Sequence, residues 1–164
     1  RTHSQTMKIR FQKGKEGKAT IVWMRDAGTR EVFRASAFFV SHDLTHYAVE
    51  TNLGLKNAFY GLMAQGWEIE DFGRKDPITN KTLPLPLEAG IAEAIVGLIQ
   101  LEQGGRLTPK DTATIIEEER AKGGYADIPL TEASLNTIRE TANNLIAQWE
   151  ALEADSFFDL DFEG

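Results

Sequence analysis

The amino-acid sequence predicts an α+β fold, in which an N-terminal antiparallel β-meander of about three strands precedes a layer of four to five helices. Two observations lead to this prediction. Between residues 7 and 36, apolar and polar residues alternate with a period of two, which is typical of strands with one buried face. Beyond residue 86, apolar residues recur every three to four positions, which is the spacing of amphipathic helices. We therefore expect a sheet packed on or beside a helical layer.

Three segments near the N-terminus have strand-like patterns, and they are Met7–Lys13, Ala19–Arg25 and Arg30–Ala35. The first is the clearest, because Met7, Ile9 and Phe11 alternate with polar residues. Glycine-containing stretches at residues 14–18 and 26–29 separate the three segments. Such short connections predict hairpin turns between antiparallel neighbours.

The middle of the chain combines short helices with a loop. Ser41 is a favourable N-cap and predicts that a helix begins at His42. The expected elements are helices over His42–Thr51 and Leu55–Gln65, a short strand or capping segment over Trp67–Phe72, and a loop over Gly73–Pro86, which holds three of the five prolines.

Three longer helices are predicted in the second half of the chain. The first covers Leu87–Gln103, where apolar residues form one stripe. The second opens with the capping residue Thr108 followed by proline, and it closes before Gly123. The third follows the N-cap Thr131 and has the most regular apolar spacing, from Leu135 onward.

The length favours a single α+β domain over residues 1–152, with residues 1–6 as a flexible leader. Residues 153–164 carry five acids and several large apolar side chains, and they are expected to form an acidic-hydrophobic C-terminal tail. Two interpretations of this tail remain open. Its phenylalanines dock on the domain while the rest is solvated, or the segment becomes ordered on a protein partner or on a second copy of the chain.

Composition excludes several classes of function. A net charge of −7 argues against a nucleic-acid-binding protein, which needs a basic face. No apolar run reaches the length that spans a bilayer, so we expect a soluble protein, with the cytoplasm as the default location. The chain has no cysteine, which rules out thiolate zinc sites and a cysteine nucleophile. Neither a phosphate-binding glycine loop nor a Gly-x-Ser-x-Gly motif is present.

The main chemical signal is the pair His42 and His46, which are four residues apart. On a helix this spacing places both imidazoles on one side, where they can bind one divalent metal. Zinc is the ion that best suits imidazole and carboxylate ligands together. We expect Glu50 as a further metal ligand, although eight residues, about 12 Å along a straight helix, separate it from His42. Other sources of the third ligand are Glu68, Glu70, Asp71 and His3.

Two acids near the histidines have chemistry that suits catalysis. Asp43 or Glu50 is a candidate general base for metal-assisted hydrolysis. Glu50 also has an alternative role, as a carboxylate that orients His46 through its second ring nitrogen. Two competing interpretations stay open. The histidines are structural and bond to neighbouring carboxylates or backbone, or the protein is a non-enzymatic interaction module that uses its C-terminal helix and tail.

The sequence Ser-His-Asp-Leu-Thr-His-Tyr-Ala-Val-Glu at residues 41–50, followed by Leu53–Gly61, resembles a group of bacterial proteins. These carry an H-D-L-x-H-x-x-V-E segment and then a Gly-Leu…Phe-aromatic-Gly stretch, and no activity is established for them. The resemblance covers about residues 39–66 and implies a bacterial protein of unknown function. A looser similarity is to the H-D-x-x-H zinc motif of ubiquinone-biosynthesis assembly proteins. Those have a glutamate twelve positions past the second histidine, where this chain has Ala58, and we transfer no function from them.

Overall fold

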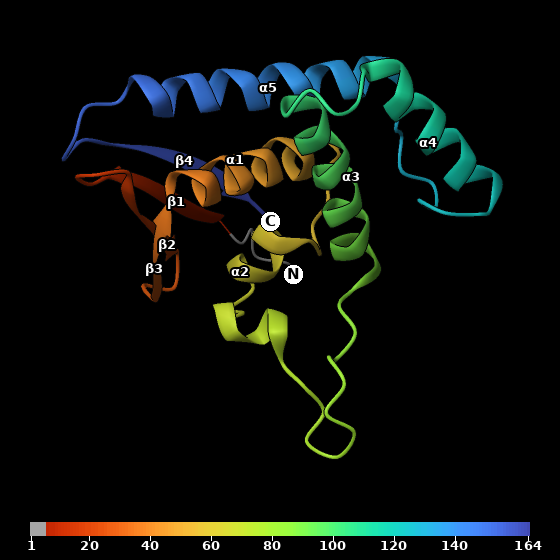
Figure 1. Ribbon diagram of the computed structural model, residues 1–164. Helices are drawn as coiled ribbons and strands as arrows, with labels where there is room; N and C mark the ends of the chain where they lie inside the picture. Colours follow the sequence, from red (N-terminus) through yellow and green to blue (C-terminus); the bar gives the residue numbers. More distant parts are fainter. Residues whose placement is uncertain (1–5) are drawn as a thin grey trace.

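The structure, a computed structural model, describes residues 6–164 and confirms the predicted α+β class (Figure 1). The expected leader falls almost entirely on residues 1–5, which lie outside the described part of the chain. In chain order the elements are β1 (Thr6–Lys13), β2 (Lys18–Arg25), β3 (Arg30–Ser36), α1 (Ala37–Asn52), α2 (Phe59–Ala64), the 3₁₀ helix η1 (Ile69–Gly73), α3 (Leu87–Gln103), α4 (Pro109–Ala121), α5 (Glu132–Ala151) and β4 (Phe157–Glu163).

The sheet is antiparallel and its strand order is β3-β2-β1-β4. The three N-terminal strands form the predicted meander, with Ile9 of β1 opposite Trp23 of β2. Alternate residues face the helices and are almost fully buried, as the period of two requires. The residues buried on this face include Met7, Ile9, Phe11, Ala19, Ile21 and Trp23.

The C-terminal segment differs from the predicted tail, because residues 157–163 form the fourth strand of the same sheet. Phe158 and Phe162 point into the core and are 9% and 3% exposed. On the opposite face, Asp159 pairs with Arg10 of β1, with 2.9 Å between carboxylate oxygen and Nε. Three of the five acids that suggested a solvated tail therefore lie on the outward-facing side of a strand, and two of them, Asp159 and Asp161, pair with Arg10 and Lys8 of β1 across the ladder.

Helix α1 begins five residues earlier than the sequence predicts. Its N-cap is Ser36, whose hydroxyl accepts a hydrogen bond from the Phe39 amide at 3.3 Å. The prediction of Ser41 as N-cap is therefore wrong, and Ser41 lies inside the helix. The earlier start continues the chain directly from β3, so the apolar side chain of Val40 packs against the sheet.

Two other boundaries in the middle of the chain also differ from the prediction. The second helical piece is only Phe59–Ala64, because residues 53–58 form turns. The segment expected as a short strand or capping segment contains the 3₁₀ helix η1, which begins with a capping box between Glu68 and Asp71. The predicted loop over 73–86 is present and extends away from the body (Figure 1). Helices α3, α4 and α5 match their predictions, with Thr108 and Thr131 as the N-caps of α4 and α5.

Helix α1 joins the two parts of the hydrophobic core. Its N-terminal half contributes Val40 and Leu44 to the cluster beneath the sheet. Its C-terminal half contributes Ala48 and Val49 to a second cluster with α3, α4 and α5. In Figure 1, α1 lies beside the sheet. Helix α5 runs along α1, and α3 crosses α1 near its C-terminal end. The side chains of this central helix are thus enclosed on most sides. None of the helices in residues 6–164 is long and apolar enough to cross a bilayer.

Candidate metal centre

One face of α1 carries most of the polar groups that the fold encloses. His42, Asp43, His46 and Glu50 follow one another at spacings of one, three and four residues, so they line adjacent positions on the helix. The side chains of three of them are nearly inaccessible: Asp43 is 2%, His46 3% and Glu50 0% exposed. Buried polar groups of this kind require partners, so the contacts of each one define the site.

The two histidines lie together, with 4.7 Å between their ring centroids. The Nδ1 atom of His42 is 3.0 Å from the side-chain oxygen of Gln100 on α3. The Nδ1 atom of His46 is 2.8 Å from Oε2 of Glu50, one turn further along α1. An oxygen acceptor at each Nδ1 favours the hydrogen there, so Nε2 is the nitrogen that can bind a cation once it carries no proton. This is the usual arrangement around histidines that bind metals.

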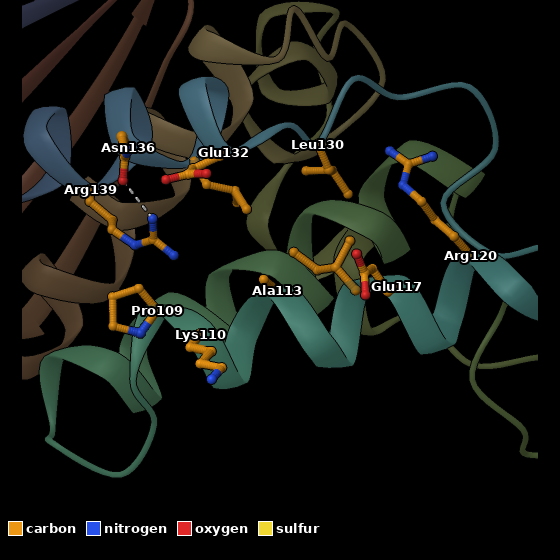
Figure 2. A pocket seen from close by; sticks show the side chains of 11 residues that line it. Pro109, Lys110, Ala113, Glu117, Arg120, Leu130, Glu132, Asn136 and Arg139 are labelled. Carbon is orange, nitrogen blue, oxygen red and sulfur yellow. Dashed lines mark hydrogen bonds between the residues drawn. The ribbon is translucent and has the colours of Figure 1, made fainter.

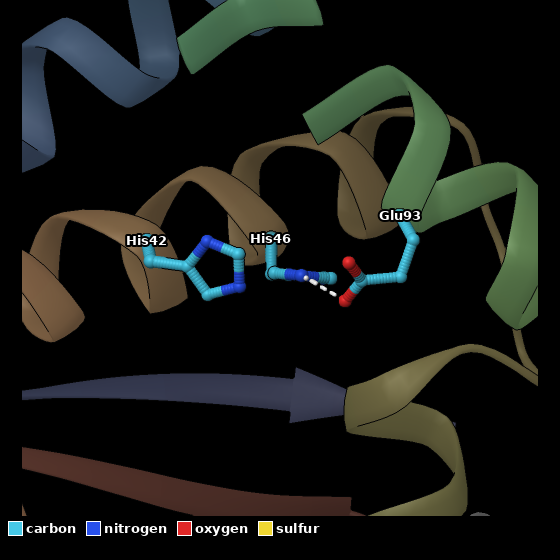
Figure 3. Close-up of side chains that lie close together, drawn as sticks. All are labelled: His42, His46 and Glu93. Carbon is cyan, nitrogen blue, oxygen red and sulfur yellow. Dashed lines mark ion pairs between the residues drawn. The ribbon is translucent and has the colours of Figure 1, made fainter. Parts of the chain in front are cut away.

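A third potential metal ligand comes from α3, where the carboxylate of Glu93 lies 2.8 Å from Nε2 of His46 (Figure 3). One potential ligand atom from each of His42, His46 and Glu93 lies within 4.8 Å of the other two. A tetrahedral zinc ion with bonds of about 2.0 Å separates its ligand atoms by about 3.3 Å. The separation of 2.8 Å between Nε2 of His46 and the Glu93 carboxylate is shorter than this value, and no separation in the set exceeds 4.8 Å. The Glu93 side chain is 59% exposed and free to adjust, so the three residues fit the ion with small side-chain movements.

With no cation between them, His46 and the two carboxylates form a buried ion triad. Burial lowers the pKa of the His46 imidazole, but hydrogen bonds to Glu50 and Glu93 outweigh it and raise that pKa to about 10. Burial raises the pKa of Glu50, and its bond from His46 opposes this effect. Both Glu50 oxygens accept hydrogen bonds, one from His46 and one from the Tyr60 amide at 2.8 Å, which favours its ionised form.

Asp43 lies beside this triad without a comparable partner. Its Oδ2 atom is buried and has no hydrogen-bond partner among residues 6–164. Burial raises the pKa of the Asp43 carboxyl to about 7, against the opposing effect of the His46 charge. The Tyr60 hydroxyl donates to the backbone oxygen of Asp43 at 2.9 Å, so the backbone is held while the carboxyl group is not. An unpaired buried carboxyl that changes its charge near neutral pH has the properties of a general base.

A cavity of about 350 Å³ opens next to these groups. Its polar wall consists of His42, Asp43, His46 and Glu93. Its apolar wall consists of Phe39, Phe59, Ile69, Phe72, Leu85 and Ala89. A pocket with an apolar lining and a few convergent polar groups is the usual form of a small-molecule site.

A larger hollow of about 610 Å³ lies between α4 and α5 (Figure 2). Its arginines already have partners: Arg139 donates to Glu102 at 2.7 Å, and Arg120 donates to the backbone oxygen of Ile128. It also lacks a histidine among its lining residues in the described chain. The smaller cavity beside α1 is the better candidate, because two imidazoles and the carboxyl groups of Asp43 and Glu93 line it together.

Comparison of the chain with protein-family models, curated proteins and solved structures finds no match. The residues of the site agree only in part with those expected from the sequence. The structure brings His42 and His46 together as predicted and sets Asp43 beside them. It places Glu50 against Nδ1 of His46, which is the orienting position considered for it, and away from the Nε2 side where the donor atoms converge.

The third donor, Glu93, was missed by the sequence analysis. Glu68 and Glu70, considered for this role, lie with Glu31 in a separate acidic group, and Asp71 caps η1. His3 lies outside the described residues. A signal for Glu93 was present, because it shares one face of α3 with the buried residues Ala89 and Val96. Its carboxylate extends from this face to Nε2 of His46, at 2.8 Å.

Proposed function

We propose that the protein binds one divalent cation, zinc by its ligand chemistry, through Nε2 of His42, Nε2 of His46 and the carboxylate of Glu93. The observation that carries the proposal is the convergence of three ligand atoms within 4.8 Å of one another. Two imidazoles and one carboxylate form a ligand set that catalytic zinc sites use, and it leaves a coordination position open. Gln100 and Glu50 support it by holding the opposite nitrogen of each ring.

The reaction class that fits this arrangement is metal-assisted hydrolysis in the adjoining cavity. A divalent cation held there acts as a Lewis acid and makes water nucleophilic at neutral pH. Asp43 accepts the proton of the attacking water and returns it to the leaving group, because its carboxyl is unpaired and lines the same cavity. Glu50, the other base considered from the sequence, has both oxygens engaged, and we assign it to orienting His46.

Metal analysis tests the cation site. We expect wild-type protein to bind one zinc per chain, and the double variant His42→Ala/His46→Ala to lose more than about 100-fold in affinity. The pair Glu68→Gln/Glu70→Gln is the matched control, since it removes acids of the separate acidic group and should bind zinc normally. Because zinc displaces the proton of His46, uptake should release protons, and zinc affinity should rise with pH up to about 10, the pKa of His46. Isothermal titration calorimetry in two buffers of different ionisation enthalpy measures the zinc affinity and the number of protons released.

Two results would contradict the cation site. One is negligible zinc binding by wild-type and double variant alike. The other is a lower melting temperature for His46→Ala that is the same with and without a chelator, while added zinc leaves wild-type protein unchanged. Either result would indicate that the ion pairs of His46 with Glu50 and Glu93 have a structural role only.

The role of Asp43 has its own test. In zinc-loaded protein, Asp43→Asn keeps the size of the side chain and should lower hydrolysis of 4-nitrophenyl acetate by about 100-fold, the usual contribution of a general base. Zinc affinity should stay within a few-fold of wild type, because Asp43 is not a ligand in the proposal. Asp127→Asn, at an exposed position, is the control. Unchanged zinc-dependent hydrolysis by Asp43→Asn would remove Asp43 from the mechanism.

A further inference from the structure

The residues that line the cavity beside the candidate metal centre indicate which class of ligand it accepts. Six of the ten residues that line it are apolar, and three of these are phenylalanines. The rings of Phe59 and Phe72 are 4.9 Å apart between centroids, and Phe72 also packs against Trp67 at 5.1 Å. On the other side, Phe59 lies 5.9 Å from the ring of His46. An aromatic wall therefore runs from the metal-binding imidazole outward along the cavity.

The charges around the cavity disfavour an anionic ligand. None of its lining residues in the described chain is a lysine or arginine. The carboxylates of Glu93 and Glu50 balance the two charges of a divalent ion, and Asp43 adds a further acid to the wall. A phosphate or carboxylate ligand would thus meet no uncompensated positive charge, whereas a neutral group such as an ester or amide carbonyl would meet no repulsion.

The size of the cavity limits the ligand further. A volume of 350 Å³ equals that of about twelve water molecules at about 30 Å³ each. This is the lower end of the range for small-molecule pockets. It accommodates a single ring with a short substituent.

We propose that the site, given the proposed cation, accepts a small neutral molecule whose aromatic or branched apolar group packs on Phe59, Ile69 and Phe72 while an ester or amide carbonyl faces the two histidines. This inference rests on the proposed function and names its substrate class. The apolar wall supplies affinity through burial of the ring, and the short distance from wall to imidazole positions the carbonyl. Hydrolysis adds water across the bond between the carbonyl carbon and its leaving group, and it yields an acid and an alcohol or amine.

Two hydroxamates test the inference, because both chelate zinc through the same deprotonated hydroxamate group and differ only in the attached methyl or phenyl, so their common charge cancels in the comparison. Benzohydroxamate should bind zinc-loaded protein at least 10-fold more tightly than acetohydroxamate. Phe72→Ala should reduce this preference several-fold without changing zinc affinity or acetohydroxamate binding. Ile69→Ala provides a second variant, since both positions are only partly buried and tolerate truncation. Phe38→Ala is the control, because Phe38 is 74% exposed and does not line the cavity.

The outcomes separate the two proposals. Suppose that wild-type protein binds zinc but binds the two hydroxamates equally, or binds inorganic phosphate more tightly than benzohydroxamate. Either result would show that the apolar substrate class is wrong and would leave the metal site in place. If both Phe72→Ala and Ile69→Ala keep the full preference for benzohydroxamate, the assignment of the ring to this wall is wrong. If wild-type protein binds no zinc, the proposed function and the inference fail together.

Discussion

Removal of residues 153–164 should unfold the protein. β4 is hydrogen-bonded along the length of β1, and its Phe158 and Phe162 belong to the core beneath the sheet. Loss of a buried phenylalanine side chain costs about 3–5 kcal/mol, and a domain has only about 5–15 kcal/mol of stability in total. Two such losses, with the backbone pairing of a whole strand, exceed what the fold can lose. Far-UV circular dichroism and urea denaturation of the chain truncated before Glu153 measure this effect.

Single substitutions in β4 serve as controls for this expectation. Phe158→Ala should lower the free energy of unfolding by several kcal/mol, whereas Phe157→Ala should lower it much less. Phe157 is 47% exposed and lies on the other face of the sheet, next to Arg10. A truncated chain that melts within a few degrees of the full chain would show that β4 is dispensable. It would also revive the interpretation of this segment as a tail that is available to a partner.

Replacement of Glu50 should have the largest effect of any single change in the site. In protein treated with a chelator, Glu50→Ala should lower the free energy of unfolding by about 3–5 kcal/mol, because it leaves the buried His46 charge without its fully buried partner. It also removes the acceptor for the Tyr60 amide. Glu50→Gln retains an acceptor for that amide and should cost less. Urea denaturation at pH 7 compares the two variants.

The pH dependence of stability provides an independent check on Glu50. The groups that face His46 are Glu50, Asp43 and His42 on its own helix and Glu93 on α3. The folded-state pKa of His46 is raised to about 10, from an ordinary value of about 6.5. Between these values folded protein holds a proton that unfolded protein has released. The stabilisation is therefore complete below about pH 6.5 and is lost as the pH rises towards 10.

Chelated wild-type protein should thus become less stable from pH 7 to pH 10, and Glu50→Ala should show a clearly smaller change over that range. The raised pKa of Asp43, about 7, acts in the same direction at lower pH, because the folded state again binds the extra proton. Urea midpoints at several pH values give the difference between the variants. Parallel profiles for wild type and Glu50→Ala would contradict the buried ion pair.

The elements that sequence analysis predicted correctly are those with a strong local signal. Alternation in β1 and the capping residues Thr108 and Thr131 determine structure within a few residues of themselves. The start of α1 was predicted wrongly because Ser36 and Ser41 are both acceptable caps. The choice depends on how the chain leaves β3. β4 was missed because its acids are satisfied by Lys8 and Arg10, nearly the whole chain away in sequence.

In the candidate site, too, the features set by local sequence were predicted and those set by distant contacts were not. The spacing of His42 and His46 predicted that their rings would lie on one side of a helix, and they do. Glu93 is supplied by a different helix, so only the packing of α3 on α1 brings it within reach of His46. The hydrogen bond from the Tyr60 amide that fixes Glu50 likewise depends on where α2 packs. Local pattern therefore identified one helix face, and tertiary structure supplied its partners.

The pairing of β1 with β4 has a consequence for biosynthesis. When the ribosome has made the first half of the chain, β1 has only β2 as a neighbour, and its other edge exposes unpaired amide and carbonyl groups. That edge is covered only when residues 157–163 have emerged, so the sheet closes late in the synthesis of this domain. High contact order of this kind slows folding, and until β4 arrives the charged side chain of Lys8 on β1 disfavours pairing of the open edge with another chain.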